Sequence, residues 1–131
     1  MKFVDKQLAL QLNEKGFNKP CFGEYRHGHD NLIPFLTNGD QNFEELLQYS
    51  WFIPAPTIDQ VLEWLREEKD IDIVIYPIDR NTIYMGGEKY ILSIYFCGKR
   101  DYKIHKDNND KFVKWEDACI AGINFVVEHL I

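Results

Sequence analysis

Apolar residues recur three and four positions apart in three segments of the chain, which is the spacing of one face of a helix. The first segment predicts a short helix from the N-cap Asp5 to Lys15. The second predicts a helix from Ile58 to Glu68, and the third predicts a C-terminal helix over residues 115–130. Helices therefore stand near both ends of the chain and in its middle.

Two details of these helices follow from single residues. Thr57 precedes the second helix and Gln60 follows three positions later, which is the arrangement of a capping box. Gly122 lies inside the third helix, where a glycine costs about 1 kcal/mol relative to alanine. We therefore expect another backbone to approach closely at Gly122.

Alternating and β-branched residues predict strands. A brief strand is expected at residues 21–26. Residues 71–76, 81–85 and 89–96 predict three strands joined by short connections, and residues 102–105 add a short fourth. This order predicts an antiparallel meander sheet of three to four strands. With the helices packed on one face of that sheet, the predicted fold class is α+β.

Residues 27–56 follow neither the helical nor the strand period. Glycine, proline, asparagine and aspartate interrupt both patterns repeatedly. We predict a long loop there, with an extended piece at residues 32–36 and a helical turn or two at residues 42–48.

Size and charge limit the classes of function. The 131 residues, with a mass of 15.6 kDa, predict a single domain over residues 1–131. The formal net charge of −6 repels phosphate backbones, so nucleic-acid binding is disfavoured. The stretch from Lys99 to Lys114 departs from this balance, with six basic and three acidic residues. We interpret it as a solvated hairpin, with contact to a phosphate or an acidic partner as the alternative.

Cysteine usage and the N-terminus indicate a compartment. Cys21, Cys97 and Cys119 form no Cys-x-x-Cys pair, and we interpret them as buried, reduced thiols. The first residues become charged before any apolar stretch of signal-peptide length, and no run approaches the roughly 18 apolar residues of a membrane span. These features predict a cytoplasmic protein without a membrane partner.

Common catalytic and cofactor motifs are missing from the sequence. Gly86-Gly87 lacks the glycine spacing and the following lysine of a phosphate-binding loop, so a hairpin turn explains it. The chain contains neither Gly-x-Ser-x-Gly nor His-Glu-x-x-His. We therefore expect no cofactor and no catalytic residue, which favours a non-enzymatic role over an enzyme.

Residues 27–30 form the one cluster with metal-ligand chemistry. His27, His29 and Asp30 offer two imidazoles and a carboxylate, which suit zinc or another transition metal. After folding, His105 or His129 could complete the set. The spacing matches no established ligand pattern, so a polar surface loop is the competing interpretation.

Trp51, Phe52 and Ile53 stand directly before Pro54, in a stretch that cannot pair as an interior strand. Such a segment either folds over the core or presents an apolar patch to a partner. If these side chains are exposed, they are candidate contact residues, because a few aromatic anchors often dominate the binding energy of an interface.

Several of these features together resemble a group of small uncharacterised proteins encoded by phages, prophages and mobile elements of gut bacteria. The residues that carry the resemblance are Gly16-Phe17 after the first helix, Cys21-Phe22, Ala55-Pro56-Thr57, Gln60, Trp64-Leu65-Arg66, Trp115-Glu116-Asp117-Ala118 and Gly122-Ile123. The resemblance covers most of the chain apart from the loop around residues 27–50. It implies a small stand-alone α+β domain of mobile-element origin, and it brings no activity, cofactor or catalytic residue.

The sequence thus leaves two hypotheses for the function. The first is a non-enzymatic protein-interaction module that binds a protein partner or forms a homodimer, through Trp51, Phe52 and Ile53 or through an uncovered sheet face. The alternative is a small metal-dependent protein or enzyme that uses the loop from His27 to Asp30.

Overall fold

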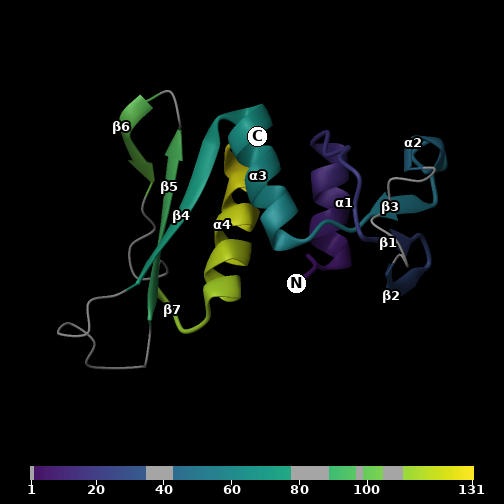
Figure 1. Cartoon of the computed structure of the whole chain (residues 1–131), viewed down its shortest axis with the longest axis horizontal. Helices are drawn as coiled ribbons and strands as arrows, with labels where there is room; N and C mark the ends of the chain where they lie inside the picture. Colours follow the sequence, from purple (N-terminus) through teal and green to yellow (C-terminus); the bar gives the residue numbers. More distant parts are fainter. Residues whose placement is uncertain (1, 35–42, 78–88, 97–98, 105–110) are drawn as a thin grey trace. The chain divides into compact units, whose positions relative to one another are not determined.

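The computed structural model describes residues 2–34, 43–77, 89–96, 99–104 and 111–131 (Figure 1). The chain divides into two compact units, Met1–Trp64 and Leu65–Ile131. The described residues form helices and two antiparallel sheets, which confirms the predicted α+β class. The single domain over residues 1–131 stays a prediction.

The N-terminal helix α1, Lys6–Glu14, has the predicted cap. The Asp5 side chain accepts a hydrogen bond of 2.8 Å from the backbone N–H of Leu8. The next residue after the C-cap Lys15 is Gly16, whose φ of 96° lies in the left-handed region that favours glycine. The apolar face of α1, formed by Leu8, Ala9 and Leu12, is buried.

A three-stranded antiparallel sheet follows α1 in the first unit. Its strands are β1 (Gly23–Arg26), β2 (His29–Pro34) and β3 (Phe52–Pro54), in the order β2-β1-β3, and a short helix α2 (Phe43–Leu46) precedes β3. This sheet was not predicted, because a three-residue strand that ends in proline carries no alternation. Among the described residues β3 pairs with β1 alone, so Pro54 lies on an edge strand and does not need to donate a hydrogen bond within the sheet.

The segment before α1 is tied to the rest of this unit by buried polar contacts. The Tyr25 hydroxyl donates a hydrogen bond of 2.7 Å to the Val4 carbonyl, and the Val4 N–H bonds the Pro56 carbonyl at 3.0 Å. Burial is the main cause that raises the pKa of Tyr25, and the negative charge of Asp5 adds to it. The hydroxyl therefore stays a donor at neutral pH.

Helix α3, Ile58–Lys69, confirms the predicted capping box. The Thr57 N–H bonds Oε1 of Gln60 at 3.0 Å, and the Gln60 N–H bonds Oγ1 of Thr57 at 3.3 Å. The Gln60 amide also donates to the Pro20 carbonyl at 2.9 Å. Trp64 is buried, and its ring meets Phe17 edge-on at 5.3 Å between centroids.

The second unit contains the other sheet and the last helix. Its elements are β4 (Ile71–Pro77), β5 (Tyr90–Phe96), β6 (Lys99–Ile104), β7 (Lys111–Phe112) and α4 (Trp115–His129). The strand order is β4-β5-β6, all antiparallel, and β7 pairs with β5. The predicted meander is therefore present over β4, β5 and β6.

The pairing differs from the prediction in one respect. Residues 81–85, which we expected as a strand of the meander, lie outside the described residues. β4 pairs directly with β5 along its whole length, from Ile71 opposite Phe96 to Pro77 opposite Tyr90.

Helix α4 packs on one face of the β4-β5-β6 sheet, where it contacts β4 and β5 (Figure 1). At Gly122 an added Cβ would lie 2.9 Å from Cγ2 of Ile73 and 2.9 Å from Cδ1 of Leu92. The expected close approach of a backbone is therefore wrong. Two side chains of the sheet occupy the space beside this glycine.

Among the described residues, no helix is long and apolar enough to cross a membrane.

Candidate functional site

Phe52 and Ile53 begin β3 and Trp51 directly precedes it, and the three side chains have different environments. Phe52 is 3% exposed and Ile53 is 1% exposed, so both belong to the core of the first unit. Their proposed role as surface anchors is corrected by this burial. Trp51 is half-buried and keeps part of its ring at the surface.

Trp51 is the centre of a group of planar side chains. Its ring stacks on that of Tyr49, with 5.3 Å between centroids and 24° between planes. The guanidinium carbon of Arg26 lies 4.9 Å from the Trp51 ring centroid, which is a cation–π contact. Phe52 meets the Trp51 ring edge-on at 6.2 Å. We call Arg26, Tyr49 and Trp51 the aromatic cluster.

Strand pairing and a turn bring the cluster together. Arg26 is the last residue of β1 and lies opposite Phe52, the first residue of β3. Trp51, which directly precedes Phe52, is therefore close enough to contact the Arg26 side chain. The His27 N–H bonds the Trp51 carbonyl at 3.3 Å, and the Phe52 N–H bonds the Tyr49 carbonyl at 3.2 Å. These backbone bonds hold Trp51 and Tyr49 next to the end of β1.

A buried carboxylate holds Arg26 in position. Nη2 of Arg26 lies 3.1 Å from Oε1 of Glu24, and Nε lies 3.4 Å from Oε2. The two residues are two positions apart on β1, so their side chains share one face of the strand. The Glu24 side chain is only 6% exposed. A buried carboxylate without a partner would be costly, so the pair both orients the guanidinium and satisfies Glu24.

The cluster remains accessible despite these contacts. Tyr49 is 48% exposed and the Arg26 side chain is 46% exposed. Tryptophan, tyrosine and arginine are the side chains most enriched at the energetic centres of protein interfaces. A surface where all three are stacked and held in place loses little side-chain entropy when it is covered.

The predicted metal loop is only partly described. His27 is exposed, in the turn between β1 and β2, and Gly28 beside it has a φ of 82°. His29 and Asp30 begin β2, and their side chains lie outside the described residues. His105 is also outside them, while His129 of α4 lies against Phe125, with 4.8 Å between ring centroids. The metal site at His27, His29 and Asp30 stays a prediction.

Where side chains are described, no group of three or more histidine, cysteine, aspartate or glutamate residues could hold a metal ion.

Two of the three cysteines are buried free thiols, as predicted. They are Cys21 and Cys119. Burial raises the pKa of Cys21 to about 12, and its thiol donates to the Lys19 carbonyl at 3.2 Å. Because the thiolate is the nucleophile, the burial and the raised pKa of Cys21 disfavour it as a nucleophile. Cys97 lies outside the described residues.

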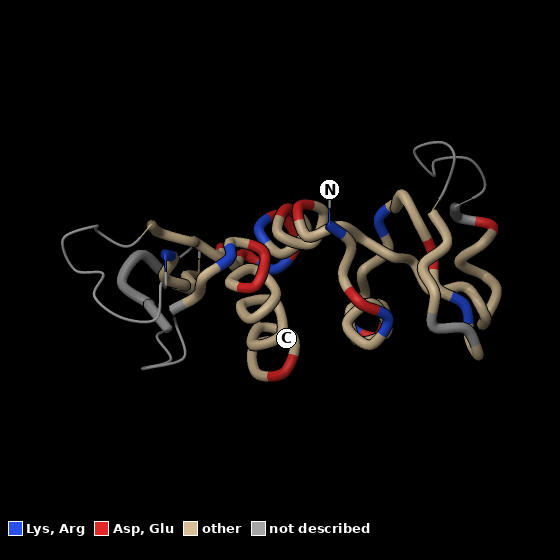
Figure 2. The backbone as a smooth tube through the Cα atoms, turned by 90° about the horizontal axis from the view of Figure 1, so that it is seen from below, with Lys and Arg blue, Asp and Glu red and all other residues tan. Residues whose placement is uncertain are grey.

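The basic stretch between Lys99 and Lys114 is described mainly by its backbone, as β6 and β7. Lys114 is exposed and precedes α4, whose first turn carries Glu116 and Asp117. These carboxylates oppose an anion at that helix end. Figure 2 shows acidic and basic residues interspersed along the described backbone.

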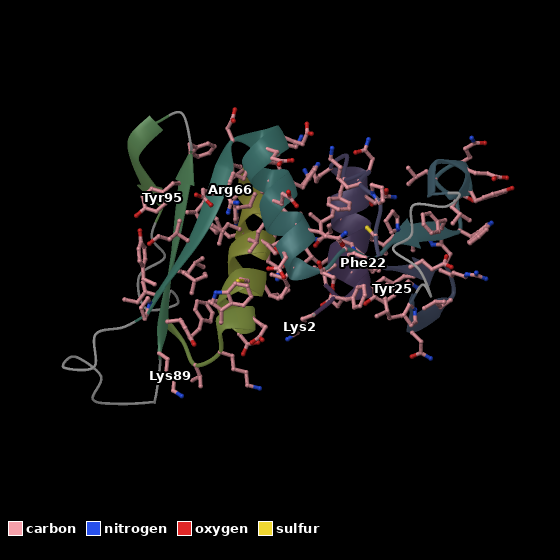
Figure 3. The ribbon with its side chains drawn as sticks, viewed as in Figure 1. Lys2, Phe22, Tyr25, Arg66, Lys89 and Tyr95 are labelled. Atoms are coloured by element: carbon pink, nitrogen blue, oxygen red, sulfur yellow. The ribbon has the colours of Figure 1, made fainter. Side chains whose placement is uncertain are left out.

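The face of the second sheet away from α4 carries a pair of tyrosines. The hydroxyls of Tyr76 on β4 and Tyr95 on β5 lie 3.1 Å apart, and Tyr95 points away from α4 (Figure 3). The hydrogen bond with Tyr95 is the first cause that raises the pKa of Tyr76. Ser93 lies on this face by strand alternation, and its buried hydroxyl has no hydrogen-bond partner among the residues that the structure describes.

Sequence reasoning identified Trp51 but missed Tyr49 and Arg26. Tyr49 opens the same aromatic segment, two residues before Trp51, yet nothing in the sequence singles it out as a contact residue. Arg26 gave no signal, because its place beside Trp51 depends on the register between β1 and β3.

Comparison of the chain with protein families, with curated proteins and with solved structures finds no match.

Proposed function

We propose that the chain is a non-enzymatic protein-interaction module and that the aromatic cluster is its contact site. The observation that carries the proposal is the stacking of Tyr49 and Arg26 with Trp51 at a surface where both partners remain about half exposed. The cluster offers flat apolar area together with a donor-rich guanidinium.

The energetic argument concerns preorganisation. Arg26 is anchored by Glu24 and Trp51 is anchored by Phe52 and the turn from Tyr49, so the side chains are already ordered before a partner arrives. Immobilising a free side chain at an interface costs about 0.5–1.5 kcal/mol, and that cost is reduced here. The favourable burial of the exposed rings is then retained as binding energy.

The wider biological setting follows from the resemblance to small proteins of phages and mobile elements. It supports an accessory protein of mobile-element origin that works in the host cytoplasm and needs no cofactor. Its partner is a protein or a second copy of the chain. Nucleic acid is disfavoured because the net charge of −6 repels phosphate.

The test compares three alanine variants as bait in extracts of the host cell. Trp51→Ala and Tyr49→Ala each remove one ring of the cluster. Trp115→Ala is the matched control, because Trp115 is 37% exposed and lies in the other unit. We expect the wild type and Trp115→Ala to retain the same protein, identified by mass spectrometry, and both cluster variants to lose it.

Circular dichroism and thermal unfolding establish that each variant is folded. Retention of the same proteins by wild type and Trp51→Ala would contradict the proposal. Elemental analysis of the purified chain tests the metal alternative. One metal per chain that His27→Ala and His29→Ala remove would favour that alternative.

A further inference from the structure

The two outer strands of the β4-β5-β6 sheet differ in chemistry. β6 reads Lys-Arg-Asp-Tyr-Lys-Ile, so most of its residues are charged. Its pairing with β5 also shifts register between Tyr95 and Phe96. Charged residues and irregular register are devices that keep an edge strand from pairing with another chain. The β6 edge is therefore protected.

β4 carries one charged residue, Asp72, and has no shift of register. It reads Ile-Asp-Ile-Val-Ile-Tyr-Pro, and its register with β5 is unbroken over all these residues. Its single charge, Asp72, is already paired with Arg66 at 3.2 Å. Within the described part of the chain, no strand pairs with the outer side of β4. A long, regular, apolar edge of this kind is a template for a further strand.

We infer that the outer edge of β4 pairs with β4 of a second copy of this chain, antiparallel and across a twofold axis. An antiparallel pair of identical strands is self-complementary, so it satisfies the symmetry of a dimer. Because the β6 edge is protected, β4 is the strand that the β4-β5-β6 sheet of each copy offers for pairing, within the described residues. The assembly then closes at two copies and does not extend into a fibre.

The single charge on β4, Asp72, fits this occupant. With Val74 on the twofold axis, Asp72 of one strand stands opposite Tyr76 of the other, and Ile73 stands opposite Ile75. Pairing about this axis places no like charges opposite each other. It also keeps the two faces of the sheet continuous across the axis, because residues of even number, which share one face of β4, pair only with residues of even number in the second copy.

Val74 lies on the face away from α4, which makes it the residue to change. Ile73 meets α4 beside Gly122, and successive strand side chains point to opposite faces. Val74 is partly exposed in the single chain. A charge at this position is therefore compatible with the sheet and would face its own copy across the axis.

This inference goes beyond the proposed function, because β4 and the aromatic cluster lie in different units. The experiment is light scattering behind size exclusion on the full chain over a series of concentrations. We expect the wild type to reach twice the chain mass of 15.6 kDa. Val74→Lys sets two lysines opposite each other and should raise the dimer dissociation constant by about tenfold or more.

Two further variants separate the edge from other surfaces. Ile91→Lys puts the same charge on the same sheet face but on the central strand β5, opposite Tyr76. It should leave the dimer intact. An equal mixture of Val74→Lys and Val74→Glu should restore a heterodimer, since opposite charges then meet at the axis. This rescue also shows that each variant is folded.

Three results would overturn the inference. One is a wild type that stays monomeric at every concentration. Another is a dimer that Val74→Lys leaves unchanged, or that Ile91→Lys weakens equally. The third is a dimer that Trp51→Ala dissociates and Val74→Lys does not, which would assign self-association to the aromatic cluster. A dimer that Val74→Lys dissociates and Trp51→Ala does not supports pairing through β4. This result holds even if the aromatic cluster proves not to bind a partner.

Discussion

Replacing Gly122 by alanine is expected to destabilise the second unit, although alanine is the better helix former. Alone, the change would stabilise α4 by about 1 kcal/mol. The new Cβ, however, would lie 2.9 Å from both Cγ2 of Ile73 and Cδ1 of Leu92. Carbon atoms pack best at about 3.5–4.0 Å, so both side chains, or the helix, must shift by more than half of one ångström.

The magnitude follows from the balance of these two effects. Inserting a methyl group into a well-packed core costs about 1–3 kcal/mol. Ile73 is 7% exposed and Leu92 is 9% exposed, so neither has open space into which it can move freely. Subtracting the helix gain leaves a net loss of about 1 kcal/mol, with a range from near zero to about 2 kcal/mol.

Urea unfolding followed by far-ultraviolet circular dichroism measures this loss. The matched experiment adds Leu92→Val, which removes Cδ1 and makes room for the new methyl group. In the double-mutant cycle the protein with both changes should be more stable, by about 1 kcal/mol, than the sum of the two single effects predicts. A Gly122→Ala protein more stable than the wild type, or a cycle without coupling, would refute the packing argument.

Three other changes test single features of the fold by the same unfolding assay. Thr57→Ala removes the acceptor of the Gln60 N–H and should lower the free energy of unfolding by about 1 kcal/mol. An unchanged urea midpoint would show that the capping box does not stabilise the protein. Asp70 has a φ of 56°, in the left-handed region that favours glycine. Asp70→Gly should therefore raise the free energy of unfolding by up to about 1 kcal/mol, and Asp70→Ala should not. The reverse order would show that the backbone is not strained at Asp70. Ser93→Ala removes a buried hydroxyl that has no partner among the described residues, and it should raise the free energy of unfolding by about 1 kcal/mol. A lower free energy of unfolding would show that the hydroxyl makes a hydrogen bond.

The local elements could be predicted because their signals lie within a few residues. Asp5 caps α1, and Thr57 with Gln60 opens α3, through bonds that span three positions in the chain. The α3, β4 and α4 segments also carry the hydrophobic period of their own secondary structure. Interactions of this range depend little on the rest of the chain, so the sequence alone was sufficient for them.

Pairing between distant segments could not be predicted in the same way. β1 and β3 are separated by more than twenty residues, and nothing in either strand specifies their register. That register decides that Arg26 meets Trp51 and that Phe52 is buried. The candidate site therefore needed the tertiary structure, even though one of its residues stood out in the sequence.

Gly122 shows where the two kinds of information meet. The sequence determined that a glycine inside α4 must serve a purpose, because helix propensity disfavours it. Only the tertiary structure decided which atoms approach it, and they are the side chains of Ile73 and Leu92 on two neighbouring strands. The physical reason is that propensity is a property of the local backbone, whereas packing depends on residues that only the fold brings together.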